Sequence, residues 1–542
     1  MKKLLAAIVL AAALLSCTNV NQSIGGNFIA TNQKYDFHTA EFNLEDVWNR
    51  SVDSLTAYSS RRINFGTIRD KEYGLFRRGC VVTLVPVYQD VDFGQDPIFQ
   101  RFRFKATPDS VSMAESADAN ILQNVNVYAL TEPLDPKDYY SNTEIKHGSE
   151  RITKGIPIVN GVDSLTFEFT SEFGSRFFNI TDEDMSDFSK YTSKFPGIYI
   201  TTDDPVGEGG RFNMFKQNII EKNASSGYVT RADNFALLYY SGIYDGVRKD
   251  STLMFYFSPL QFNDLDSLIR AGASSVDQYV FNVDYHQTTG MAEKAGEKIV
   301  IEGGSGLKPV ITADEIRRLI HQDIAANGGN PQTTLITKAT IEMPFEFPDD
   351  YRKLYLFPAV LSPSVKVGTD STVAFAGLTD ASVSTENQGN INRSLCCYAP
   401  DVTHHVQQII RQTKEDISSY DVWMLIMRKV VTTTSNEEAS QMADYYQQMA
   451  YYSYYNQLYG GYGGYGGYGG YGGYGGYGGY GGYGYNNYYN YMMMAQAASA
   501  SATSTSVSYE LDKDFYYNCS LLGPESGTRR PKLRVTYALP RE

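Results

Sequence analysis

Short runs in which apolar and polar residues alternate recur along most of this chain. In Arg101-Phe102-Arg103-Phe104-Lys105 both Phe fall on one side and the charged residues on the other, and Leu165-Thr166-Phe167-Glu168-Phe169 repeats the pattern. A period of two is typical of a strand with one buried face. Other runs rich in β-branched and aromatic residues lie at 81–88, 125–130, 235–240, 253–257, 279–285, 298–302, 338–347, 353–357, 422–427 and 532–539.

Clusters of Gly, Pro, Asn and Asp separate these runs. Many short strands joined by such turn-forming residues indicate antiparallel sandwiches. The predicted fold is therefore mostly β, with two antiparallel β-sandwich-like regions and a few short amphipathic helices. The clearest helix covers 312–328, where Thr312-Ala313-Asp314-Glu315 forms a capping box and apolar residues follow at helical spacing. Two further helices are predicted over 401–416 and about 183–191.

A low-complexity segment interrupts the pattern between Ser440 and Ser508, and a Tyr-Gly-Gly array fills Tyr459–Tyr483. Glycine loses much backbone entropy on ordering, and the array has no aliphatic residue to bury. We therefore expect a disordered Tyr/Gly-rich insertion in a loop between strands at 422–431 and 509–517. Two roles stay open for it: weak multivalent adhesion through its Tyr rings, or a passive spacer.

The first seventeen residues have the layout of an export signal. Lys2 and Lys3 precede an apolar stretch over 4–15, and the stretch closes with Leu14-Leu15-Ser16-Cys17. A cleavage site that ends in Cys resembles the lipobox of bacterial lipoproteins, in which the thiol of Cys17 is acylated. The alternative is an ordinary signal peptide with an incidental Cys.

Charge and cysteine content narrow the range of partners. The formal net charge of −14 disfavours nucleic acid, because phosphate binding depends on Lys and Arg. An acidic chain is also repelled by anionic headgroups, so the lipid anchor and not a basic patch is expected to hold it on the membrane. The other cysteines are Cys80, Cys396, Cys397 and Cys519. Buried free thiols are expected for these four, although a bridge from Cys519 stays open.

Two motifs look superficially like metal sites. Asp90-x-Asp92-x-Gly94-x-Asp96 starts like a calcium loop but lacks its later ligands, so a polar turn between strands is expected. Cys396-Cys397 precedes His404-His405, but adjacent ligands diverge and zinc ligands are normally spaced two to four apart. Packing of the predicted helix explains His405 better. No metal and no cofactor is predicted.

Other candidate residues also have structural explanations. Gly303-Gly304-Ser305-Gly306 lacks the features of a nucleophile elbow or a phosphate loop, so a tight turn between strands is expected. The acidic residues over 182–187 suit a helix N-terminus. Trp48 and Trp423 lie in apolar segments and are expected in the core. No catalytic grouping emerges, and the chain is not expected to be an enzyme.

The order of several short segments resembles a family of large bacterial outer-membrane lipoproteins known as domain of unknown function 4270. The resemblance implies an outer-membrane lipoprotein with a β-rich body, no established activity and no catalytic residues. Glu302 stands where the family's glycine signature usually has Gln. The matching segments are Gly26–Ile29, Val125–Leu130, Asp138–Asn142, Phe188–Ile200, Ile301–Gly306, Ile336–Ile341 and Pro531–Tyr537.

These observations predict a lipid-anchored envelope protein that acts by binding or as an accessory of an outer-membrane complex. Its partner would be an outer-membrane barrel or another envelope protein, and the leaflet orientation stays open. The alternative is a glycan- or nutrient-binding lipoprotein beside an outer-membrane transporter, which the many Tyr residues favour. The expected regions are a signal peptide over 1–16, an N-terminal β region over 17–160, a central β region with short helices over 161–310, a C-terminal α+β region over 311–439, the insertion over 440–508 and closing strands over 509–542.

Overall fold

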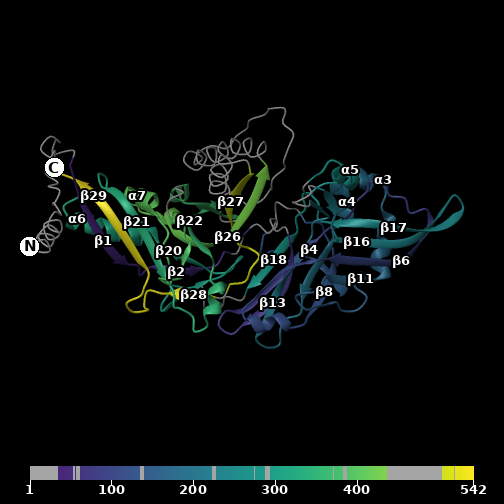
Figure 1. Cartoon of the computed structure of the whole chain (residues 1–542), viewed down its shortest axis with the longest axis horizontal. Coiled ribbons are helices and arrows are strands. Elements are labelled where there is room, and N and C mark those ends of the chain that lie inside the picture. Colours follow the sequence, from purple (N-terminus) through teal and green to yellow (C-terminus); the bar gives the residue numbers. More distant parts are fainter. Residues whose placement is uncertain are drawn as a thin grey trace, which may run out of the picture.

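The structure is a mostly β protein in which every pair of named strands is antiparallel, as predicted (Figure 1). Its strands form two bodies joined end to end, the terminal body and the inserted body. The computed structural model describes residues 34–52, 55, 62–134, 140–222, 228–273, 275–286, 293–369, 372–382, 387–435, 503–517 and 519–541.

The inserted body is a sandwich of two sheets. The larger sheet has the order β10-β8-β12-β4-β3-β13-β7, with β9 paired to β8 and β18 paired to β4, and the smaller has the order β11-β6-β16-β17-β5. The larger sheet contains β3 (Arg62–Asp70), β4 (Gly74–Val82), β7 (Pro108–Met113), β8 (Gln123–Leu130), β9 (His147–Arg151), β10 (Ile158–Val159), β12 (Ile198–Thr202), β13 (Gly209–Lys216) and β18 (Phe281–His286). The smaller contains β5 (Leu84–Pro86), β6 (Gln95–Ala106), β11 (Leu165–Phe169), β16 (Phe235–Tyr244) and β17 (Val247–Phe257).

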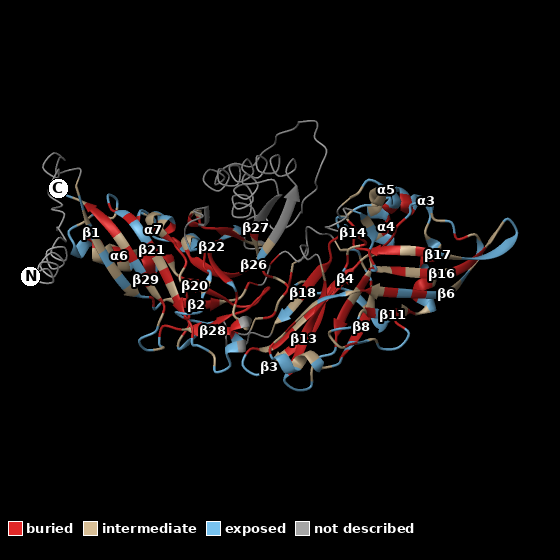
Figure 2. Ribbon diagram, in the orientation of Figure 1, coloured by how far each residue is buried: buried red, intermediate tan, exposed pale blue. Residues whose placement is uncertain are grey.

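Aromatic side chains fill the space between these two sheets. Phe102 and Phe104 of β6 are fully buried, so the alternation seen in the sequence is confirmed. The ring of Phe104 stacks on Phe167 of β11 with centroids 4.6 Å apart and on Phe257 of β17 at 4.5 Å. Figure 2 shows this buried interior, whereas the tip of the β16–β17 hairpin is exposed.

The terminal body contains both ends of the described chain. Its first sheet has the order β1-β29-β21-β25-β24 and its second has the order β2-β20-β26-β22-β23, with β27 paired to β26. The first sheet contains β1 (Tyr35–Asn43), β29 (Lys532–Pro540), β21 (Leu335–Pro344), β25 (Cys397–Tyr398) and β24 (Ile391–Asn392). The second contains β2 (Val47–Arg50), β20 (Lys308–Ile311), β26 (Val422–Ser435), β22 (Val360–Thr369), β23 (Thr372–Gly377) and β27 (Thr503–Leu511). A separate pair consists of β19 (Lys298–Ile301) and β28 (Cys519–Leu522).

Pairing of the first strand with the last determines how the chain is divided. β1 pairs with β29 from Tyr35 opposite Pro540 to Asn43 opposite Lys532. The chain therefore starts in the terminal body, passes through the whole inserted body and returns (Figure 1). Strands on both sides of residue 160 share one hydrophobic core, so the sheets group the strands differently from the regions 17–160, 161–310 and 311–439.

Helix α6 (Ala313–Ala326) forms where predicted, but its N-terminus is capped by other residues. The Thr312 hydroxyl donates to Asp46 at 2.7 Å, and the Ala313 N–H donates to the Asp421 carboxylate at 2.9 Å. Glu315 accepts the backbone N–H of Asp46 at 2.9 Å. The predicted capping box is therefore wrong, because neighbouring strands supply partners that lie far away in the sequence.

Three other sequence assignments need correction. The segment 183–191 forms two helices, α3 (Asp182–Ser186) and α4 (Phe188–Lys194), because Asp187 leaves the helical conformation and caps α4. Helix α7 (Thr403–Ile410) is shorter than the predicted 401–416. The run at 353–357 is a 3₁₀ helix, η5 (Tyr351–Leu356), and not a strand.

The low-complexity insertion leaves the body from a two-stranded ladder. β26 and β27 pair from Met427 opposite Leu511 to Ser435 opposite Thr503. The insertion therefore ends before Thr503 and not at 508, because its last predicted residues belong to β27. The Tyr-Gly-Gly array lies outside the described residues.

The two bodies meet at a buried ion pair and at the segment that follows β27. The Arg78 guanidinium of β4 binds both carboxylate oxygens of Asp284 on β18, at 2.6 and 3.0 Å. It also donates to the Asp514 carbonyl of the terminal body at 2.7 Å. Two residues further on, the ring of Tyr516 packs against both Phe76 and Phe212 of the inserted body. Both polar and apolar contacts therefore lock the junction.

We expect Arg78→Ala to lower the free energy of unfolding by about 3–5 kcal/mol, because it leaves the Asp284 carboxylate buried without its ion-pair partner. Arg103→Ala is the matched control, since this Arg lies on the exposed face of β6. Urea denaturation of both variants measures the difference. Equal stability of the two variants would contradict the role assigned to the ion pair.

Candidate binding cleft

A cleft of about 520 Å³ opens on the outer face of the larger sheet, beside the junction. Its volume lies within the range of about 300–1,000 Å³ that ligand sites normally have. The inserted body provides most of the wall, and Ser51 and Ser305 of the terminal body complete it. The remaining lining residues are Arg77, Gly79, Asn142, Thr143, Glu144, Ile145, His147, Tyr199, Val283, Asp284, Tyr285 and His286.

His147 and Tyr199 line one side of the cleft, and Tyr128, outside the lining, completes a row of three rings with them. The ring of His147 on β9 stacks with Tyr128 of β8, with centroids 4.5 Å apart, and with Tyr199 of β12, at 5.2 Å. Gly79 of β4 provides the space for Tyr199, since a Cβ atom there would lie 2.3 Å from the Tyr199 hydroxyl. Any side chain at position 79 would therefore displace the row.

A cationic and aromatic pair forms the opposite side. The Arg77 guanidinium lies 5.2 Å from the ring centroid of Tyr285, a cation–π distance. Asp204 holds the same guanidinium through two hydrogen bonds, of 2.9 and 2.6 Å. Because Arg77 is fixed in this way and the Tyr285 side chain is 54% exposed, the ring presents apolar area with a polar tip to the opening.

Backbone hydrogen bonds hold the loop that carries Asn142, Thr143 and Glu144. The Ser141 N–H donates to the Leu55 carbonyl at 2.7 Å, and the Asp284 N–H donates to the Ser141 carbonyl at 2.6 Å. The loop is therefore attached both to the segment after β2 and to β18. This attachment places its polar side chains at the rim of the cleft.

The glycine-rich segment over 303–306 lies against the ion pair of Arg78 and Asp284 at the junction of the two bodies. It is a tight turn between β19 and β20, as predicted, and Gly304 has a φ of +56°. A Cβ atom on Gly304 would lie 2.8 Å from the Asp284 carboxylate and 2.9 Å from the Arg78 guanidinium. Glycine is therefore required here both for the backbone conformation and for close approach to the ion pair.

Buried charged groups surround this turn. Glu302 lies 3.0 Å from the His286 imidazole and accepts the Leu307 N–H at 2.7 Å. Burial of the imidazole opposes protonation, but the hydrogen bond and the charge of Glu302 raise the pKa of His286 overall. The Lys308 ammonium donates to the Gly306 carbonyl at 3.1 Å, and burial lowers its pKa to about 8.

The two metal-like motifs have structural roles. The Asp92 carboxylate accepts the Gly94 N–H at 2.7 Å, which is the geometry of a polar turn. His405 is buried in α7, where its Nε2 lies 2.8 Å from the Tyr420 carbonyl, and burial lowers its pKa to about 4. In the part of the chain that the structure describes, no group of three His, Cys, Asp or Glu side chains is placed to hold a metal.

The cysteines and the acidic cluster also lie away from the cleft. Cys80, Cys396, Cys397 and Cys519 are buried free thiols, and burial raises the pKa of Cys519 to about 12. In the acidic cluster, Asp184 accepts the Thr181 N–H at 2.8 Å and closes a capping box. The cluster therefore serves a helix N-terminus, as predicted.

The two Trp residues lie in the second sheet of the terminal body, where the predicted core role is confirmed for Trp423, whereas Trp48 is only partly buried. Trp423 is buried, and its ring centroid lies 5.4 Å from that of Phe375. Trp48 packs against the same apolar cluster, and its indole N–H donates to Asp46 at 3.2 Å. Neither ring lines the cleft.

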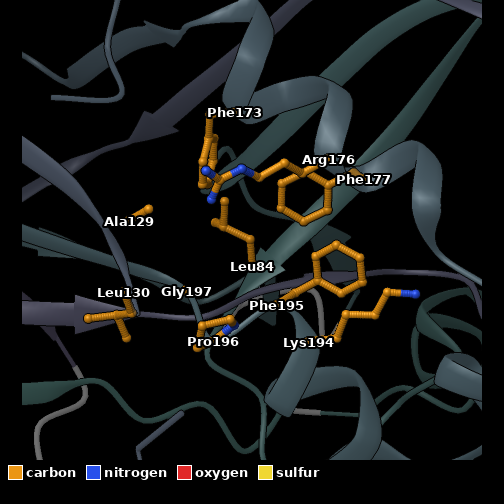
Figure 3. Close-up of a pocket in the computed structure, with 10 residues that line it drawn as sticks. All are labelled: Leu84, Ala129, Leu130, Phe173, Arg176, Phe177, Lys194, Phe195, Pro196 and Gly197. Atoms are coloured by element: carbon orange, nitrogen blue, oxygen red, sulfur yellow. The ribbon is translucent and has the colours of Figure 1, made fainter. Parts of the chain in front are cut away.

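A second pocket lies inside the inserted body, but it is too small for an ordinary ligand. Its volume is about 40 Å³, and Figure 3 shows the Phe177 and Phe195 rings beside Leu84. The two rings stack with centroids 5.1 Å apart. The Lys194 side chain extends away from the pocket (Figure 3). This space is a packing feature of the core.

Sequence reasoning missed the cleft, although it identified the glycine turn behind it. Arg77, His147, Tyr199 and Tyr285 come from four segments, and each stands in or beside an ordinary strand pattern. The available signal was the outward side of β4, where Arg77 is followed two positions later by Gly79, a residue without a side chain. That signal does not reveal which other strands lie alongside.

Comparison with known proteins provides no relative: no family model, no curated protein and no solved structure matches the chain. Cys17 and the signal segment lie outside the described residues. Within the described ranges, no helix is long and apolar enough to cross a membrane.

The His286–Glu302 pair predicts a pH dependence of stability. Because the folded state raises the pKa of His286 above 6.5, the pair stabilises the fold fully below about pH 6.5, and this contribution is lost as the pH rises through the folded pKa. The melting temperature should therefore fall as the pH rises above about 6.5. Melting curves of His286→Gln and of Glu302→Gln should both show a smaller slope, and an unchanged slope in both would contradict the assignment.

Proposed function

We propose that this chain is a lipid-anchored protein of the bacterial envelope that acts by binding, with the junction cleft as its ligand site. The observation that carries the proposal is the cleft itself, in which both bodies contribute side chains around a space of about 520 Å³. A binding role also fits an accessory of an outer-membrane complex. The net charge of −14 argues against nucleic acid as the ligand.

The rigidity of the cleft supports binding. The ion pair of Arg78 with Asp284 lies directly behind it, and the Ser141 carbonyl and N–H attach the rim to both bodies. A preformed site loses less entropy on binding than a flexible one. The rings and the polar rim together supply apolar contact area and orienting hydrogen bonds.

A second candidate function is glycan or nutrient binding beside an outer-membrane transporter. The exposed ring of Tyr285 and the row of Tyr128, His147 and Tyr199 favour it, because flat amphipathic rings suit the apolar faces of sugars. The charged groups of Arg77 and Glu144 would then hydrogen-bond to hydroxyl groups.

The anchor has a direct test. We expect Cys17→Ala to abolish lipid attachment. The variant should then either be released from membranes or keep its signal peptide uncleaved. Membrane fractionation and mass measurement of the N-terminal peptide give the result. If the variant is processed and sediments with membranes like the wild type, the lipoprotein assignment is wrong.

The cleft is tested with a photo-cross-linking amino acid placed at Tyr285 in the membrane-anchored protein. A cross-linked product is expected there, but not with the same amino acid at Val247, an equally exposed position at the tip of the β16–β17 hairpin. Arg77→Ala should reduce the yield. Equal products at both positions would show that the cleft has no special role.

The same cleft separates the two candidate functions. Binding of the mature chain to immobilised oligosaccharides should weaken about tenfold in Tyr285→Ala if a sugar stacks on the ring, since such a contact is worth roughly 1.4 kcal/mol. A protease-sensitive cross-linked product without oligosaccharide binding would instead favour a protein partner.

A further inference from the structure

The outer face of the first sheet of the terminal body changes from apolar to charged along its strands. Residues directly opposite each other in antiparallel strands point to the same face. Phe37 of β1 lies opposite Ala538 of β29, and Ala538 lies opposite Leu335 of β21. A row of three apolar side chains therefore crosses the sheet near the end where the described chain begins and ends, since Tyr35 lies opposite Pro540.

The rows that follow are increasingly polar. Thr39 lies opposite Thr536, and their hydroxyl groups are 3.1 Å apart. The next row contains Glu41, which accepts hydrogen bonds from Lys532 at 2.6 Å and Arg534 at 2.8 Å. Glu41 lies four positions after Phe37 on β1, so the apolar part of this face is roughly 13 Å from its charged part.

Three large apolar side chains at this end of the sheet are open to solvent, whereas Ala538 between the strands is buried. Phe37 is 68% exposed, Tyr35 is 42% exposed and Leu335 is 40% exposed. We call these three residues the apolar tip. Such a group of exposed apolar side chains marks an interaction surface more often than a scatter of single residues does.

The charge at the tip is compensated. Arg541 binds the Asp36 carboxylate through its Nε at 2.8 and 2.9 Å, and this hydrogen bonding lowers the pKa of Asp36. The tip therefore differs from the chain as a whole, whose net charge is −14. An anionic surface would repel the body but not this end of it.

The chain outside the described residues leads from the tip to the expected lipid. Residues 18–33 separate Lys34 from Cys17. At about 3.3–3.6 Å per extended residue they can span at most roughly 60 Å, so the tip, where the described chain begins, stays within that distance of the acylated thiol. Tyr side chains favour the headgroup region of a bilayer, and Phe and Leu side chains are buried at the boundary between headgroups and acyl chains.

We propose that the apolar tip inserts into the headgroup region of the membrane and so orients the protein with its inserted body and cleft pointing outward. The proposal rests on the lipid anchor of the proposed function and goes beyond it, because an anchor alone leaves the body free to rotate. The aromatic pair and the leucine provide a second, weaker attachment. Two attachments hold an orientation that one does not.

The test uses fluorescence quenching by lipid. The mature chain carries a hexahistidine tag in place of Cys17 and is bound to phosphatidylcholine vesicles that contain a nickel-chelating lipid and brominated acyl chains. Phe37→Trp introduces an indole at the tip, and Val162→Trp is the matched control on the inserted body, where Val162 is 73% exposed. The native Trp48 and Trp423 give the same background in both variants.

The emission added by Phe37→Trp should shift to shorter wavelength on the vesicles and lose roughly half its intensity to brominated lipid, whereas that of Val162→Trp should change little. Equal quenching at both positions, or none at position 37, would overturn the proposal. So would a short-wavelength emission at position 37 without vesicles, which would indicate a second copy or residues 18–33 on the tip.

The artificial tether separates this result from the anchor itself. Flotation of the natural full-length protein with membranes tests lipid attachment at Cys17. Contact of the tip is read independently on the nickel-chelating vesicles. Either result can therefore fail while the other stands.

Discussion

The arrangement of this molecule depends on one buried ion pair. Arg78 is completely buried, and it is held by the Asp284 carboxylate and the Asp514 carbonyl. Asp284 comes from the last strand of the inserted body, and Asp514 comes from a segment that the chain reaches only near its end. A charge in such a position is tolerated only when all its partners are present. All the partners of Arg78 are therefore in place only when the two bodies are docked and the segment that carries Asp514 lies beside Arg78.

Other features of the junction follow from this constraint. The turn behind β19 must approach the ion pair closely, which requires glycine at position 304. Glu302 then turns inward and meets His286, and Lys308 donates to carbonyl groups of the turn. Tyr516 packs beside them against apolar rings. The junction is thus a continuous polar and aromatic contact and not a flexible linker.

The cleft is a consequence of the same docking. Its walls are rigid because Asp284, which holds Arg78 through its side chain, also holds the Ser141 loop through its backbone N–H. A ligand in the cleft would touch both bodies, through Ser51 and Ser305 on one side and the rings of the inserted body on the other. Binding there would further stabilise their relative position.

The sequence by itself determined the local features of this protein. Alternating residues such as Phe102 and Phe104 specified strands with one buried face, and the apolar spacing after Thr312 specified a helix, because both periodicities follow from backbone geometry. Only the tertiary structure decided the partners. The cap of α6 comes from Asp421, β1 pairs with β29, and the cleft residues come from four segments. These contacts join residues far apart in the chain, and no local pattern encodes which distant strand will lie alongside.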